Sequence, residues 1–277
     1  MMCAWNELLK ILPTSIRDDV DKLGRHTLQE LRLRLGRPPE LRTSNGAIWL
    51  NSIIKEQEIS FVINTASRYS PWAAATAAKG YITAFGGHRI GICGDVVVAG
   101  GVITGIKNVS SLCVRVARDF PGIAANAKMQ EGNILLLGPP GSGKTTLLRD
   151  LIRQISDSRD SSIAVIDERG ELFPPGFPQG KRTDILTGCC KAEGITMALR
   201  TMGPGCIAVD EITAKEDCNA LVEAGWCGVR LLATAHAADG NDLRTRPVYR
   251  PLWESRLFET LIILRPDKSF RTERVHL

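Results

Sequence analysis

The chain has 277 residues, of which 44% are hydrophobic, and a formal net charge of +5 from 35 basic and 30 acidic residues. This length and hydrophobic content suffice for one large or two modest packed domains. The charges are scattered rather than gathered in a tract, so they allow nucleic-acid binding without indicating it. No run of about 18 apolar residues occurs, and the first residues lack the features of a secretory signal, so we expect a cytoplasmic protein.

The helical spacing of apolar residues is clearest in the first segment, over about residues 5–36. It includes Leu28, Leu31 and Leu35, and the sequence Arg37-Pro38-Pro39 then stops a helix. The spacing predicts a helical start to an N-terminal domain.

Short apolar runs punctuated by glycine follow between residues 41 and 118, as in Val96–Gly101. Such runs are typical of strands. They predict a small mixed sheet, with a helix near residues 60–80. We interpret residues 1–122 as a smaller α+β domain of its own.

Beyond residue 122 short apolar runs alternate with helical stretches. The runs are residues 134–137, 163–166, 207–209, 231–233 and 261–264. Strands separated by helices form a parallel sheet with helices on both faces. We therefore predict an α/β domain over residues 123–277.

A glycine-rich loop carries the strongest chemical signal. A buried strand runs into G-x-x-x-x-G-K-[ST], and a helix follows, which is the context that a phosphate-binding P-loop requires. Its backbone N–H groups and the helix N-terminus attract phosphates, Lys144 neutralises the β- and γ-phosphates, and the Thr145 hydroxyl binds Mg²⁺. A chance match by a glycine-rich turn is the alternative. The predicted nucleotide-binding residues are Gly138, Pro139, Pro140, Gly141, Ser142, Gly143, Lys144, Thr145 and Thr146.

An acidic pair ends a later strand, because Asp210 and Glu211 follow the apolar run up to Val209. Ligands bind at the carboxyl edge of open parallel sheets. We predict that Asp210 holds Mg²⁺ through water and that Glu211 is the base that orients the attacking water. The alternative is a pair of carboxylates that only begins a helix.

Two further strand ends contribute candidates at the same edge of the sheet. Asp167 and Glu168 end one strand, and Glu168 either polarises water or belongs to a surface loop held by Arg169. Thr234 and His236 end another strand and are candidate sensors of the γ-phosphate, although a lone histidine is more often structural.

Taken in order, these motifs resemble the stage III sporulation protein AA family, a branch of the type II and type IV secretion ATPases of RecA-like fold. The resemblance covers nearly the whole chain. The segments that carry it are Leu31–Pro38, Lys79–Thr83, Gly86–Gly94, the P-loop, Ile166–Arg169, Lys191–Gly194, Val209–Ile212, Lys215–Asp217 and Thr234–His236.

The resemblance implies an ATPase that uses ATP and Mg²⁺ in the mother cell of endospore-forming bacteria. It implies a homo-oligomer, a hexameric ring, beneath the membrane channel proteins of the sporulation complex, with membrane contact through these partners alone. No stable nucleic-acid partner is expected. Two alternatives remain open, a nucleic-acid-associated P-loop ATPase and a scaffold that binds ATP without turnover.

In related motors, arginines outside the P-loop domain reach the phosphates. The resemblance points to Arg89, and after it to Arg115 and Arg118, as such residues here. Arg200, which lies within the P-loop domain, matches a further arginine of the family. An arginine finger accelerates hydrolysis by about 10³-fold or more. Each of these arginines is equally open to interpretation as a surface residue.

The eight cysteines show no C-x-x-C pair and no paired spacing around histidines. Zinc sites and disulfide frameworks show such spacing. We therefore expect buried free thiols.

Overall fold

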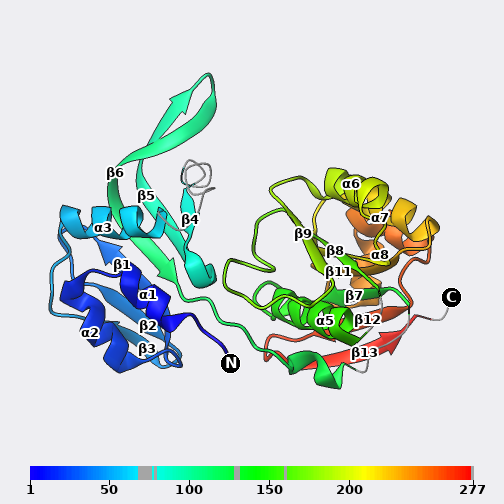
Figure 1. The fold of residues 1–277 in the computed structure, drawn as a ribbon, viewed down its shortest axis with the longest axis horizontal. Coiled ribbons are helices and arrows are strands. Elements are labelled where there is room, and N and C mark those ends of the chain that lie inside the picture. The colour runs from blue at the N-terminus through cyan, green and yellow to red at the C-terminus, as the bar shows by residue number, and fades with distance from the viewer. Residues whose placement is uncertain (68–76, 78–79, 128–131, 159–160, 276–277) are drawn as a thin grey trace. The chain divides into compact units, whose positions relative to one another are not determined.

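A computed structural model describes the chain except for residues 68–76, 78–79, 128–131, 159–160 and 276–277. It divides into two compact units (Figure 1). The first comprises Met1–Asp119 and Pro174–Phe177, and the second comprises Phe120–Phe173 and Pro178–Leu277. The second unit thus begins at Phe120, whereas the sequence placed residues 120–122 in the N-terminal domain.

The helices of the first unit are amphipathic. They are α1 (Trp5–Ile11), α2 (Thr14–Leu23) and α3 (Glu56–Ser67). Each buries residues three or four positions apart, such as Ile16 and Val20, which is the spacing of one helix face. Part of the helix predicted near residues 60–80 lies outside the described residues.

The helical prediction for Leu28–Leu35 is wrong, because this segment forms strand β1 (Leu28–Arg34). Gly24 follows α2 with a φ of 80°, a conformation that ends a helix and favours glycine. In β1 the buried Leu31 and Leu33 alternate with less buried neighbours. Side chains of a strand alternate between its two faces, and this alternation fits the buried leucines better than the approximate helical spacing does.

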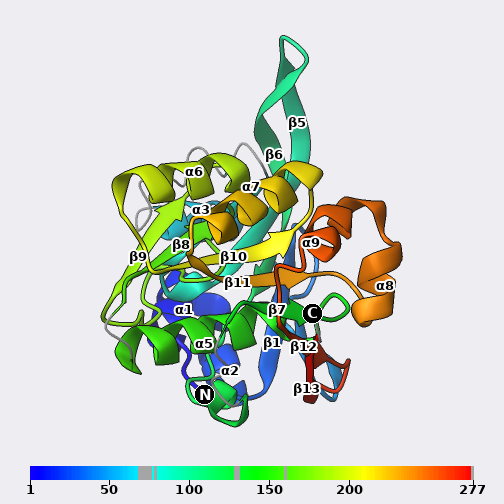
Figure 2. The same ribbon diagram turned by 90° about the vertical axis from the view of Figure 1, so that its right-hand side faces the viewer.

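The sheet of the first unit has six strands in the order β3-β2-β1-β6-β5-β4. All its neighbouring strands pair antiparallel, so the expectation of a mixed sheet is wrong. The remaining strands are β2 (Glu40–Thr43), β3 (Gly46–Trp49), β4 (Tyr81–Thr83), β5 (Arg89–Ala99) and β6 (Val102–Arg115). The β5–β6 hairpin extends beyond its sheet (Figures 1 and 2) and exposes Val98 and Val102 near its tip.

The second unit contains a seven-stranded sheet in the order β13-β12-β7-β11-β10-β8-β9. Its strand pairs are parallel except for the β12–β13 pair at one edge. All five predicted strands are present. The strands are β7 (Ile134–Leu137), β8 (Ile163–Asp167), β9 (Thr183–Thr187), β10 (Cys206–Ile212), β11 (Arg230–Ala235), β12 (Thr260–Leu264) and β13 (Phe270–Arg274).

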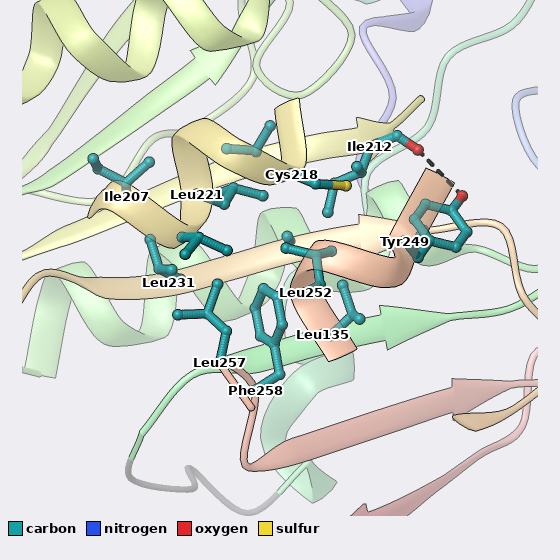
Figure 3. Close-up of a cluster of buried hydrophobic side chains, with 14 of the residues drawn as sticks. Leu135, Ile207, Ile212, Cys218, Leu221, Leu231, Tyr249, Leu252, Leu257 and Phe258 are labelled. Carbon is teal, nitrogen blue, oxygen red and sulfur yellow. Dashed lines mark hydrogen bonds between the residues drawn. The ribbon is translucent and has the colours of Figure 1, made fainter. Parts of the chain in front are cut away.

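Helices cover both faces of this sheet, with α5 on one side and α6 and α7 on the other (Figure 2). Alternate residues of the strands inside the sheet enter two separate hydrophobic clusters, as Leu135 and Leu136 of β7 show. The cluster beneath α7 and α9 is drawn in Figure 3. The helices are α5 (Lys144–Ser158), α6 (Lys191–Thr201), α7 (Lys215–Trp226), α8 (Gly240–Thr245) and α9 (Arg250–Glu254).

Among the cysteines, Cys206 and Cys218 are buried while Cys93, Cys190 and Cys227 are exposed, so the prediction of buried thiols is wrong for those three. Within the described part of the chain, no helix has both the length and the apolar character needed to cross a membrane.

Candidate functional site

The P-loop joins β7 to α5, and its glycines are required by its conformation. Gly141 and Gly143 have φ values of 75° and 96°, which side chains disfavour. A Cβ atom on Gly138 would lie 2.7 Å from Ser142 Oγ and 2.8 Å from the Leu264 carbonyl oxygen. The loop therefore turns tightly, and it ends at the N-terminus of a 15-residue helix, where the helix dipole favours an anion.

The Lys144 side chain folds onto the P-loop and is hydrogen-bonded to its backbone. Its Nζ donates to the carbonyl oxygens of Gly138 at 2.8 Å and Pro139 at 3.0 Å. Burial lowers the pKa of Lys144, while the negative charges of Asp210 and Glu211 oppose that change. The ammonium group is thus poised for an anion, because phosphates would favour its charged form.

Asp210 joins the P-loop helix to the end of β11. Thr145 Oγ1 donates to Asp210 Oδ2 at 2.8 Å, and Thr234 Oγ1 donates to Asp210 Oδ1 at 2.6 Å. A hydroxyl next to a carboxylate is the oxygen donor set that Mg²⁺ takes when it keeps most of its water ligands. These residues therefore fit the ion that the P-loop implies. The described residues contain no cluster of three or more His, Cys, Asp or Glu side chains suited to a metal.

Glu211 lies in a bulge of β10. The pairing with β11 shifts between Val209 and Ile212, and Glu211 has a φ of 55°. Left-handed backbone is uncommon for a residue with a side chain, and it costs about 1–3 kcal/mol. Thr234 Oγ1 accepts a hydrogen bond from Glu211 N at 2.7 Å, which helps to hold this conformation. Bulges of this kind redirect side chains next to functional sites.

His236 bridges Lys144 and Glu211. Its Nδ1 lies 3.1 Å from Lys144 Nζ, and its Nε2 lies 3.1 Å from Glu211 Oε1. An ammonium group donates and never accepts, so Nδ1 accepts and Nε2 carries the proton that it shares with Glu211. The other carboxylate oxygen of Glu211 receives Arg169 Nη1 at 3.1 Å.

These side chains line one pocket of about 630 Å³. The pocket contains P-loop residues 140–147 together with Asp210, Glu211, Thr234 and His236. Ser142 Oγ is buried and has no hydrogen-bond partner among the described residues, so the loop keeps a polar atom available. Sequence reasoning missed six of the lining residues, which are Phe120, Ile123, Leu147, Leu264, Lys268 and Phe270.

The Asp-Glu pair at the end of β8 has different partners. Asp167 is buried and accepts hydrogen bonds from the backbone N–H groups of Glu171, Leu172 and Phe173. Glu168 forms an ion pair with Lys191, the first residue of α6. Sequence reasoning missed Lys191 as this partner, although it lies in one of the segments that carried the resemblance.

The candidate arginines Arg89 and Arg115 lie in the first unit, opposite each other on β5 and β6. Arg89 stacks on the ring of Tyr81 at 4.1 Å, and Arg115 pairs with Glu30 at 3.6 Å. The Arg118 guanidinium donates to the carbonyl oxygens of Arg25 and Leu28. These contacts give Arg118 a structural part within the first unit.

A parallel sheet with a P-loop after β7 and carboxylates near the carboxyl end of β10 defines the RecA-like class of P-loop proteins. Solved secretion ATPases share this fold. The pilus retraction motor PilT with bound ADP aligns with a TM-score of 0.62 and 16% identity over 90% of this chain and 76% of that one. The ATPase DotB of Legionella pneumophila aligns with a TM-score of 0.59 and 17% identity over 89% and 76%.

Sequence comparison identifies the family. Residues 4–274 match the family described as Sporulation stage III, protein AA. Stage III sporulation protein AA of Bacillus subtilis (strain 168) is 35% identical over 95% of this chain and 92% of its own length. The chain belongs to this family.

Proposed function

We propose that the chain is a Mg²⁺-dependent ATPase that works as the motor of a channel complex between mother cell and forespore. The observation that carries this proposal is the network in which Lys144, Thr145, Asp210, Glu211 and His236 line one pocket. Its relatives include secretion ATPases, and its family is a sporulation family.

The P-loop binds the phosphates of ATP in this proposal. Its N–H groups and the start of α5 attract the negative charge, and Lys144 leaves the carbonyl oxygens of Gly138 and Pro139 to contact the β- and γ-phosphates. Thr145 and Asp210 would hold Mg²⁺, which neutralises the charge of the phosphates.

Glu211 orients the attacking water and receives its proton. The bulge aims its carboxylate into the pocket, and His236 and Arg169 fix one oxygen each. His236 acts with it, since its imidazole connects the base to Lys144 and can report the presence of the γ-phosphate. Glu168, tied to Lys191, supports the site from the neighbouring strand.

The proposal includes a ring in the mother-cell cytoplasm. Arg89 and Arg115 supply positive charge to phosphates in an assembled ring, a hexamer by the resemblance to secretion motors. Membrane channel proteins of the sporulation complex are the partners on which hydrolysis does mechanical work.

The test is ATP hydrolysis by the purified oligomer with Mg²⁺, with and without its membrane partners. Lys144→Ala should reduce kcat/KM by about 10²-fold or more, because it removes a charge aimed at the transferred phosphate. Particle mass measured in ATP and Mg²⁺ establishes the ring.

Two results would overturn the proposal. Wild-type protein that binds ATP in the assembled state but shows no turnover with its partners would be a scaffold. Turnover that persists in Lys144→Ala would place hydrolysis outside this pocket or in a contaminant.

A further inference from the structure

Tyr249 lies next to the proposed site without lining its pocket. It belongs to the short helix η3 (Pro247–Tyr249) and is buried, with 4% of its surface exposed. Its hydroxyl group donates to the carbonyl oxygen of Ile212 at 3.2 Å (Figure 3) and accepts from the backbone N–H of His236 at 3.2 Å. One hydroxyl therefore joins two strands that end at the site.

These two attachment points adjoin the two side chains that face each other in the pocket. Ile212 directly follows Glu211, and it pairs with Ala235, the residue before His236. The last paired residues of β10 and β11 are thus Ile212 and Ala235. Beyond this pair, the Tyr249 hydroxyl satisfies the carbonyl group of Ile212 and the N–H group of His236. A side chain thus connects the two backbones where they no longer pair directly.

We propose that Tyr249 is a positioning residue that sets the distance between the Glu211 carboxylate and the His236 imidazole. This inference rests on the proposed function. It adds a residue that neither binds nucleotide nor contacts the reacting atoms. Tyr249 acts through the backbone of Ile212, which follows the bulge, and of His236, which follows β11.

The strain in the bulge gives this connection its importance. Glu211 holds a φ of 55°, so the segment must be fixed by its surroundings to keep that conformation. Thr234 Oγ1 fixes the N–H of Glu211 on one side, and Tyr249 fixes the carbonyl group of Ile212 on the other. Burial raises the pKa of Tyr249, so its hydroxyl stays protonated and keeps donating at neutral pH.

The position of Tyr249 is itself held from a second direction. Cys218 Sγ of α7 donates to the carbonyl oxygen of Val248 at 3.2 Å, and both residues pack in the cluster that contains Phe258. A residue that only filled this core would not need a hydroxyl group. Tyr249→Phe separates the two roles, because it keeps the ring and removes the bridge.

The test compares Tyr249→Phe with wild type and with Phe258→Leu, which disturbs the same core without touching the bridge. Tyr249→Phe should lower kcat for ATP by about 10-fold or more and leave KM within about 2-fold, since a misplaced base slows the chemical step while the P-loop still binds. Phe258→Leu should keep the wild-type kcat at a temperature where both variants are folded.

A second readout does not require turnover. In ¹⁵N spectra of the full chain, the ring nitrogens of His236 report which nitrogen carries the proton. In wild type the proton should lie on Nε2, and Tyr249→Phe should mix the two tautomers and speed the exchange of the His236 amide proton.

The outcomes separate this inference from the proposed function. If wild type hydrolyses ATP and Tyr249→Phe matches its kcat, or if Phe258→Leu loses kcat to the same degree, Tyr249 has no positioning role. If wild type shows no hydrolysis, the proposed function fails, and the His236 spectra alone decide whether Tyr249 positions this side chain.

Discussion

Two neighbouring strands, β8 and β10, each have an Asp-Glu pair at or near the carboxyl end, yet the fold gives the two pairs different surroundings. Asp210 and Glu211 face the P-loop, with Thr145, His236 and Arg169 as partners. Asp167 is only 3% exposed and accepts hydrogen bonds from the backbone of the loop that follows it. Glu168 forms an ion pair with Lys191.

The difference shows that position in the sheet and backbone shape select the reactive pair. β10 lies next to β11, which brings Thr234 and His236 to Asp210 and Glu211. β8 is one strand farther from the P-loop strand β7. The bulge at Glu211 then redirects its side chain. We expect the pair on β10 to control turnover and the pair on β8 to control stability.

The largest expected effect is on turnover. Glu211→Gln should lower kcat by about 10²-fold or more, because an amide cannot take the proton of the attacking water. The matched change Glu168→Gln should lower kcat by less than about 5-fold, because this side chain is engaged by Lys191. Steady-state hydrolysis of both variants, with ATP binding measured in parallel, tests the comparison.

An equal loss in the two variants would break the distinction between the pairs. It would assign Glu168 a catalytic part as well. A kcat for Glu211→Gln near that of wild type would remove Glu211 as the base.

The next effect is on stability. Near pH 5, Asp167→Asn should lower the free energy of unfolding by about 2 kcal/mol, since the amide group cannot accept all three backbone N–H bonds in a buried place. Asp210→Asn, the matched change on β10, should stay within about 1 kcal/mol of wild type. Denaturant unfolding measures both, and a reversed order would contradict the assignment.

The smallest effect is the pH dependence of the difference in unfolding free energy between Asp167→Asn and wild type. Burial raises the pKa of Asp167 above its ordinary 3.8, against the backbone hydrogen bonds that lower it. As the pH rises past 3.8, the unfolded chain releases this proton before the native protein does, so the stabilising contribution of Asp167 is lost as the pH passes through its native pKa. The deficit of Asp167→Asn should therefore shrink as the pH rises above about 4 in unfolding experiments. A deficit that grows over this range would show that the hydrogen bonds dominate instead.

Much of the second unit could be predicted from its sequence. Five of its strands contain a short, wholly apolar run, because a parallel strand inside the sheet is buried on both faces. β9 and β13 lie at the two edges of the sheet and carry partly exposed, mixed side chains, so they gave no such signal. In the first unit, the leucines of β1 fit a helix and a strand almost equally, and pairing with β2 and β6 decides for the strand.

The candidate site divides in a similar way. The P-loop could be identified because its function requires contiguous residues of defined type. Asp210 and Glu211 could be identified because they directly follow a run of buried apolar residues. The contacts of Lys191, Tyr249 and Phe270 could not, since each joins elements that are far apart in the sequence.

Sequence alone was enough to predict the P-loop, five strands of its domain and the carboxylates near the ends of two of them. These are local features, set by residue type and spacing along a few turns of chain. The packing of the second unit selects which Asp-Glu pair contacts Thr145, which side chains bond His236, and where the backbone bulges at Glu211. These contacts depend on the order of the strands and on hydrogen bonds between segments that are far apart in the sequence. Such segments become neighbours only when the sheet is folded.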